Sequence, residues 1–121
     1  MSQKILIIDD DPVSQNMQIY ALARAGYTVI AASTGEDGIQ KAIEESPDLI
    51  ILDILMPGMD GMDVASFLKT NPETTRIPII FLSSMIKKSG EKTKDENEAT
   101  SYLAKPYIKD ELLNEVKKYF L

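Results

Sequence analysis

Residues 48–53 read Asp-Leu-Ile-Ile-Leu-Asp, and this short stretch decides the fold. The side chains at 49–52 are all aliphatic, with no polar residue alternating among them. A strand with one face in water alternates polar and apolar residues. An unbroken apolar run therefore indicates a strand covered on both faces, as in a parallel sheet. Residues 77–82 and, after Lys4, residues 5–8 of the run 4–8 are similarly apolar, and two further runs lie at 27–31 and 101–104.

Helical patterns fill most of the gaps between these runs. The first helix is predicted to begin at the capping residue Asp11 with Pro12 and to end at Gly26. The second has capping-box spacing at Ser33 and Glu36. The apolar stripes predicted to face the sheet are Val13, Met17, Ala21 and Ala25; Ile39, Ala42 and Ile43; Val64, Ala65 and Leu68; and Leu112, Leu113, Val116 and Phe120.

The alternation of strands and helices predicts the fold class. Repeated strand–helix units imply an α/β protein with a doubly wound, five-stranded parallel sheet and helices on both faces. Such sheets bind their ligands at the carboxyl ends of the strands. The weakest unit is the stretch 87–98, which contains no large apolar side chain. A helix there is expected to be short, mobile or stabilised by a partner.

Length and composition exclude several classes of protein. The 121 residues suit one domain, taken as 1–121. Cysteine and histidine are absent, which excludes disulfides, thiolate metal sites and a Ser-His-Asp triad. The net charge of −6 argues against direct nucleic-acid binding. No apolar run is long enough for a bilayer and no signal peptide is visible, so we expect no membrane association and a cytoplasmic location.

Polar side chains follow four of the five predicted strands. Asp9 and Asp10 follow the first, Asp53 the third, Ser83 the fourth and Lys105 the fifth. Because the carboxyl ends of parallel strands meet at one edge of the sheet, these side chains should converge. Oxygen ligands without histidine or cysteine favour a hard cation such as magnesium. Carboxylates, a hydroxyl and an ammonium suit phosphoryl transfer, with Asp53 as the nucleophile that forms an aspartyl phosphate.

Four segments, in this order, resemble the receiver domain of two-component response regulators. They are the pair Asp9-Asp10, the stretch 52–61 (Leu-Asp-Ile-Leu-Met-Pro-Gly-Met-Asp-Gly), the pair Ser83-Ser84, and the stretch 102–107 (Tyr-Leu-Ala-Lys-Pro-Tyr). The resemblance covers essentially the whole chain and is closest to single-domain, chemotaxis-type members. It implies the flavodoxin-like (βα)5 fold with strand order 2-1-3-4-5.

The resemblance also implies the chemistry of the site. Asp53 would accept a phosphoryl group from a histidine kinase or a histidine phosphotransfer protein. Asp9, Asp10, Asp53 and the backbone carbonyl of Leu55 would hold Mg²⁺, with Mn²⁺ as a possible substitute. Lys105 would pair with the phosphoryl group, and Ser83 would donate to it.

A second set of implied roles concerns the response to phosphorylation. Tyr102 would be the switch aromatic whose rotamer follows the shift of Ser83. Structural roles fall to Pro106, whose bond with Lys105 is expected to be cis, and to loop residues Pro57, Gly58 and Gly61. The surface expected to change comprises the stretch 87–98, the strand at 101–104 and the last helix.

The implied function is a switch and not an enzyme acting on a separate substrate. The domain would take part in its own phosphoryl transfer and dephosphorylation, and its output would be altered protein–protein contacts. The target would be a downstream effector protein or, if the chain is part of a larger protein, a fused output domain. The sequence leaves both possibilities open.

Three alternatives remain beside this interpretation. A degenerate receiver could act as an adaptor without phosphorylation, although all five site residues are present. A haloacid-dehalogenase-type phosphotransferase would need an aspartate two positions after the nucleophile, where this chain has Leu55. A flavin or nucleotide module would favour glycine after the first strand, where Asp9, Asp10 and Asp11 would repel a phosphate. On their own, Asp11 is predicted to be a helix cap, and Tyr102 could simply pack in a strand.

Overall fold

A computed structural model of the chain describes residues 2–84 and 100–120. Its centre is a sheet of five parallel strands in the order β2-β1-β3-β4-β5, which confirms the predicted fold class. The strands are β1 (Lys4–Ile8), β2 (Thr28–Ala32), β3 (Leu49–Asp53), β4 (Ile79–Ser83) and β5 (Thr100–Ala104). Each lies within two residues of its predicted position.

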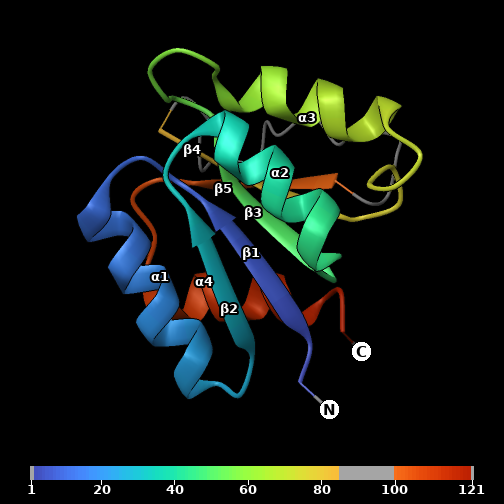
Figure 1. The fold of residues 1–121 in the computed structure, drawn as a ribbon. Coiled ribbons are helices and arrows are strands. Elements are labelled where there is room, and N and C mark those ends of the chain that lie inside the picture. Colours follow the sequence, from blue (N-terminus) through green and yellow to red (C-terminus); the bar gives the residue numbers. More distant parts are fainter. Residues whose placement is uncertain (1, 85–99, 121) are drawn as a thin grey trace.

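Helices cover both faces of this sheet. The described helices are α1 (Pro12–Arg24), α2 (Gly35–Glu45), α3 (Gly61–Thr70) and α4 (Lys109–Lys117). Helices α1 and α4 lie on one face, and α2 and α3 lie on the other (Figure 1). The helix expected at 87–98 falls outside the described residues.

The core is divided in two by the sheet, because successive side chains of each strand point to opposite faces. Ile5 and Ile7 of β1 pack toward α1 and α4, together with Leu22 and Val116. The alternate strand positions contribute to a cluster with α2 and α3 that includes Leu6, Ile8, Ile50, Leu52, Val64 and Leu68. All five residues of β3 are buried, so the unbroken apolar run correctly predicted a strand covered on both faces.

The predicted stripe of α1 was wrong except at Ala21, because Val13, Met17 and Ala25 are all exposed. Val13 and Met17 are 77% and 49% exposed, whereas Gln18, Ala21 and Leu22 are buried. Counting apolar residues at intervals of four followed the solvent face, because the buried face of this helix begins with polar side chains. Asp11 does cap the helix, since its side chain accepts a hydrogen bond from the Val13 amide.

The start of α2 also differs from the prediction. The cap is Thr34, whose hydroxyl accepts from the amide of Asp37 at 3.1 Å, and not Ser33 with Glu36. The two candidate hydroxyls are adjacent, so a shift of one residue keeps the same three-residue spacing to an acid. The predicted inner stripes of α2 and α3 are confirmed, with Ala42, Val64 and Leu68 fully buried.

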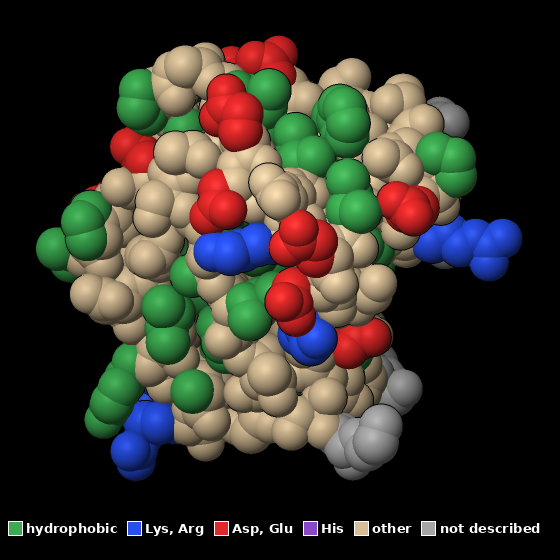
Figure 2. Space-filling model, in the orientation of Figure 1, with side chains coloured by type: hydrophobic (Ala, Val, Ile, Leu, Met, Phe, Trp, Pro, Cys, Tyr) green, Lys and Arg blue, Asp and Glu red, His purple; other side chains and the backbone are tan. Residues whose placement is uncertain are grey.

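The surface seen in the orientation of Figure 1 carries charges of both signs. Acidic side chains are scattered over this face among apolar and neutral ones, with lysines and arginines between and beside them (Figure 2). Two of the ion pairs join Lys41 to Asp37 at 3.0 Å and Lys4 to Glu45 at 3.2 Å. In the described part of the chain, no helix has the length and apolar character needed to span a bilayer.

Candidate functional site

Three carboxylates converge at the carboxyl ends of β1 and β3. One oxygen from each of Asp9, Asp10 and Asp53 can be chosen so that all lie within 4.8 Å of one another. Asp9 and Asp53 are 1% and 6% exposed, whereas Asp10 is open to solvent. Because strands β1 and β3 are hydrogen-bonded neighbours, residues far apart in the sequence meet at this edge. The predicted convergence of the acids is therefore observed.

Lys105, the residue directly after β5, joins this cluster at the same edge of the sheet. Its Nζ lies 3.3 Å from Oδ1 of Asp53. Its backbone amide donates to the carbonyl of Ser83 at 2.9 Å, which fixes the chain directly after β5. The Lys105–Pro106 peptide bond is cis, as expected.

The electrostatics of Asp53 reflect its crowded position. Burial raises the pKa of this carboxyl, and the neighbouring Asp9 and Asp10 raise it further, while Lys105 lowers it. The pKa of Asp53 is raised overall. Lys105 therefore compensates only part of the cost of burying a negative charge beside two other carboxylates. A bound cation would relieve the remaining repulsion.

Ser83 is the last residue of β4 and is 1% exposed. It is paired in register with Ala104 of β5, immediately before Lys105. On the other side, the Ile54 amide donates to the carbonyl of Leu82 at 3.0 Å, which ties the residue after Asp53 to β4. Ser83 and Asp53 thus end two neighbouring strands at the same edge of the sheet.

The loop between β3 and α3 is held close to Asp53. The amide of Gly61 donates to the carbonyl of Ile54 at 2.8 Å, and Asp60 caps α3 by accepting from Asp63. A Cβ at position 61 would overlap the backbone carbonyl oxygen of Asp53 and lie 2.7 Å from the Cα of Ile54. Glycine is therefore required here by the close approach of two backbone segments.

Other predicted loop residues lie on the outside of this turn. Gly58 has a φ of +74°, a conformation that favours glycine. Leu55 is 52% exposed, and Pro57 is exposed as well. A metal-binding role for the Leu55 carbonyl stays a prediction.

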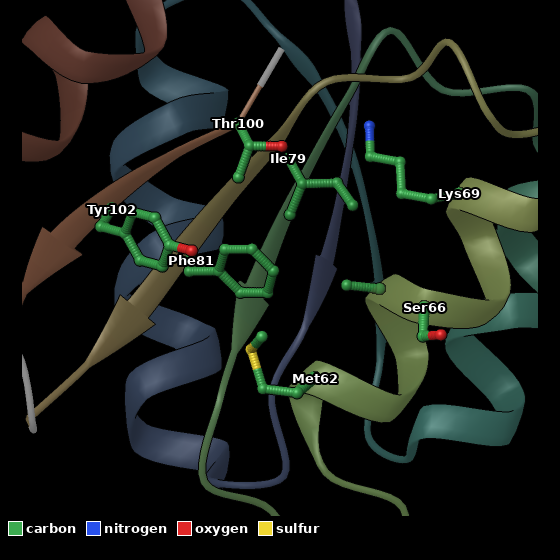
Figure 3. Close-up of a pocket in the computed structure, with 8 residues that line it drawn as sticks. Met62, Ser66, Lys69, Ile79, Phe81, Thr100 and Tyr102 are labelled. Atoms are coloured by element: carbon green, nitrogen blue, oxygen red, sulfur yellow. The ribbon is translucent and has the colours of Figure 1, made fainter. Parts of the chain in front are cut away.

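Tyr102 lies in β5 and is partly buried. Its ring stacks on that of Phe81 in β4, with a centroid distance of 5.1 Å and an interplanar angle of 21°. Both rings line a pocket of about 190 Å³ between α3 and the β4–β5 edge, with Met62 and Lys69 on its α3 side (Figure 3). This aromatic packing is compatible with a switch role and also with a simple structural role.

Sequence reasoning missed the polar residues that hold Asp9. Oδ2 of Asp9 accepts from Ser14 Oγ at 2.7 Å and from Gln18 Nε2 at 3.1 Å, and its Oδ1 accepts from the Asp11 amide at 3.0 Å. Gln15 Nε2 donates to the backbone carbonyl of Asp9 at 2.9 Å. Apolar spacing gave no signal for them, because Ser14 and Gln18 are polar and their partner Asp9 lies outside the helix.

Tyr107 is a second residue that the sequence did not single out. Burial raises the pKa of its hydroxyl to about 12, with further contributions from the nearby Asp9 and Asp53 carboxylates. Ser14 lies near enough to oppose this shift, but the hydroxyl has no hydrogen bond of good geometry within the described part of the chain. Tyr107 therefore brings a buried phenol close to the acid cluster.

The donor set fits a hard divalent cation. It consists of carboxylate oxygens from three aspartates. Because one of these, Asp10, is exposed, solvent can reach the site and complete the coordination of a cation. The ammonium of Lys105 beside Asp53 would favour added negative charge such as a phosphoryl group. This combination can bind a metal and a phosphoryl group at the same carboxylate.

Comparison with known proteins identifies the family. Residues 5–117 match the model of the response regulator receiver domain. The chain is 36% identical to the alkaline phosphatase synthesis transcriptional regulatory protein PhoP of Bacillus subtilis, over 97% of this chain and 48% of PhoP. It is 32% identical to protein PilH of Pseudomonas aeruginosa, over 93% of each chain. The chain thus spans about half of the transcriptional regulator but nearly all of PilH.

Solved structures give the same assignment. Chemotaxis response regulator CheY4 of Vibrio cholerae is 28% identical, with a TM-score of 0.86 over 98% of this chain and 99% of that one. Response regulator TrrA of Thermotoga maritima, solved with Mg²⁺ and BeF, is 31% identical, with a TM-score of 0.80 over 97% and 98% of the two chains. The chain therefore belongs to the response regulator receiver domain family of two-component signalling.

Proposed function

We propose that this receiver domain is a switch driven by Mg²⁺-dependent phosphorylation of Asp53. The observation that carries the proposal is the position of Lys105 Nζ, 3.3 Å from Asp53 Oδ1, beside the two other acids of the cluster. An ammonium and a cation site on one carboxylate match the charges of a transferred phosphoryl group. The match to the receiver family over residues 5–117 supports the same assignment.

Asp9, Asp10 and Asp53 are the residues that would hold Mg²⁺, with the Leu55 carbonyl as a further predicted ligand. When bound, Mg²⁺ supplies charge neutralisation for the oxygens of the phosphoryl group. The crowding of three acids at this edge supports metal binding, because like charges this close repel one another when no cation is present. Mn²⁺ has similar ligand preferences and is expected to substitute.

In the proposed transfer step, Asp53 is the nucleophile. An ionised oxygen of Asp53 attacks the phosphorus of a phosphohistidine, and a new P–O bond forms. The P–N bond breaks, and its electron pair remains on the imidazole nitrogen of the donor. Lys105 stabilises the negative charge of the phosphoryl oxygens, and Ser83 donates a hydrogen bond to one of them.

The output of the switch is a change in surface contacts. Ser83 ends β4, and the β4 residue Phe81 packs against Tyr102 of β5. A shift of Ser83 toward a phosphoryl group would therefore be transmitted to the Phe81–Tyr102 pair. The change in Tyr102 would alter the β5 surface that a partner protein recognises.

The phosphoryl donor is proposed to be a histidine kinase or a histidine phosphotransfer protein. TrrA, a structural relative of this chain, has been solved in complex with the histidine kinase ThkA. The outer face of α1 near the site exposes Val13 and Met17. These apolar side chains suit contact with another protein.

The experiment that tests the proposal is intact-mass spectrometry after incubation with acetyl phosphate and Mg²⁺. Wild type is expected to gain one phosphoryl group, and Asp53→Asn or removal of Mg²⁺ should abolish the gain. Lys105→Met is expected to reduce it strongly, while exposed Lys118→Met serves as the matched control. An adduct that forms equally on Asp53→Asn would refute Asp53 as the acceptor.

A further inference from the structure

A layer of polar side chains lies behind the acid cluster, on the side of α1. Gln18 is fully buried, and its Nε2 donates to Oδ2 of Asp9 at 3.1 Å. Ser14 Oγ donates to the same oxygen at 2.7 Å and also accepts from Gln18 Nε2 at 3.2 Å. One carboxylate oxygen of Asp9 is thus occupied by two side-chain donors from consecutive turns of one helix.

The other half of the Gln18 amide argues against a purely structural role. Its Oε1 is buried and has no hydrogen-bond partner within the described residues 2–84 and 100–120. A buried acceptor left unpaired costs about 1–3 kcal/mol, and a leucine or methionine would avoid that cost. Gln18 Nε2 donates to the Oγ and the backbone carbonyl of Ser14 and to Asp9, and the bond to the Asp9 carboxylate is the charged one and the shortest of the three.

Asp9 has little rotational freedom as a result. Its Oδ2 is held by Ser14 and Gln18, and its Oδ1 accepts from the Asp11 amide. Hydrogen bonds to a charged group are the stronger ones, so three of them fix the plane of the carboxylate. Held in this way, Asp9 keeps a carboxylate oxygen within 4.8 Å of an oxygen of Asp10 and of Asp53.

We propose that Ser14 and Gln18 are positioning residues that orient Asp9 for divalent-cation binding at the Asp9–Asp10–Asp53 cluster. The proposal rests on the metal site of the proposed function. Partners that orient a ligand typically change metal affinity by roughly 10–100-fold when they are removed. Because two of the three donors to Asp9 remain in each single variant, the effect of one substitution should fall at the lower end.

The test measures Mn²⁺ binding by electron paramagnetic resonance of the free ion, without any phosphodonor. Gln18→Met keeps the length and approximate volume of the side chain but removes the donor. We expect it to weaken Mn²⁺ binding about 10-fold, and Ser14→Ala to act in the same direction. Gln40→Met is the matched control, because Gln40 is an exposed residue of α2 whose side-chain amide donates to Glu44 at 2.9 Å and not to Asp9. It should change the affinity less than twofold.

A second arm separates positioning from general packing of α1. In an Asp9→Ala background, Gln18→Met should have no further effect on Mn²⁺ affinity, because the carboxylate it orients is gone. Equal losses in both backgrounds would contradict the proposal, as would an unchanged or tighter affinity in Gln18→Met. Tighter binding would show that Gln18 mainly neutralises charge. Thermal unfolding of each metal-free variant identifies any loss that comes from misfolding, and Ser14→Ala then serves as the smaller change.

The outcomes for this inference and for the proposed function are distinguishable. If wild type binds Mn²⁺ and Gln18→Met binds it equally well, the positioning role is refuted and the metal site stands. If wild type does not bind Mn²⁺ at all, the metal site of the proposed function fails, and the positioning role fails with it.

Discussion

At the scale of single residues, the site depends on how closely backbone segments approach Asp53. Gly61 lies against the Asp53 carbonyl and the Ile54 Cα. Gly61→Ala should lower the free energy of unfolding by about 2–3 kcal/mol, because a methyl group there forces the backbones apart. Gly58→Ala has open space around it and should cost only about 1 kcal/mol, from its positive φ. Urea unfolding of both variants measures this, and equal losses would show that the contact at Gly61 is easily relaxed.

Tyr107 gives a pH-dependent prediction at the same scale. Its pKa is raised from 10.0 to about 12, so the folded state favours the neutral phenol. The resulting stabilisation is complete below about pH 10 and is lost as the pH rises through about 12. Phenylalanine does not ionise, so in Tyr107→Phe the loss of stability that Tyr107 causes at alkaline pH should be absent. At neutral pH it should be neutral or stabilising by up to about 1 kcal/mol, because the buried hydroxyl makes no well-formed hydrogen bond to the described residues.

The measurement for Tyr107 is thermal unfolding at a series of pH values up to 12. The control is Tyr20→Phe, since Tyr20 is 64% exposed and its removal should leave the profile unchanged. A Tyr107→Phe variant that is clearly less stable at neutral pH would mean that the hydroxyl has a stabilising partner in solution.

At the scale of elements, the buried face of α1 differs from the face that the spacing of its apolar residues predicts. Leu22 is fully buried, whereas Met17 is 49% exposed. Leu22→Ala should cost about 2–5 kcal/mol, and Met17→Ala should stay within about 0.5 kcal/mol. Chemical denaturation distinguishes these outcomes. A large loss of stability in Met17→Ala would mean that the face predicted from the apolar spacing is the buried one.

The strands were predictable for a physical reason that did not extend to α1. Residues 49–52 are buried on both sides, so their aliphatic character is independent of which way each side chain points. A helix with polar groups on its inner face breaks the link between hydrophobicity and burial, and Gln18 is such a group. Its burial depends on Asp9, a residue of a different element, which local periodicity cannot reveal.

The site itself was largely predictable because its residues lie at strand ends. Asp9, Asp10, Asp53 and Lys105 converge as expected from parallel topology, and the comparison with known proteins confirmed the family. What could not be predicted was the layer behind them, Ser14 and Gln18. The roles of Ser83, Tyr102 and the Leu55 carbonyl stay predictions.

At the scale of the whole molecule, the site makes stability depend on a cation. Metal-free Asp53→Asn should be more stable than wild type, because burial and the neighbouring acids disfavour the Asp53 charge more than Lys105 favours it. Excess Mg²⁺ should raise the melting temperature of wild type, since it binds the folded state, and should raise that of Asp53→Asn much less. Calorimetry with EDTA or Mg²⁺ measures both effects. A variant less stable than wild type in EDTA would show that the Lys105 ion pair dominates.

The central claim is that Asp53 carries the phosphoryl group, and borohydride reduction after phosphorylation tests it most directly. Reduction converts an aspartyl phosphate to homoserine, which tandem mass spectrometry of the digested protein locates in the sequence. The account predicts homoserine at position 53, formed only in samples that contained both Mg²⁺ and the phosphodonor. Homoserine at Asp9 or Asp10, or a phosphorylated protein in which Asp53 remains unreduced, would contradict it.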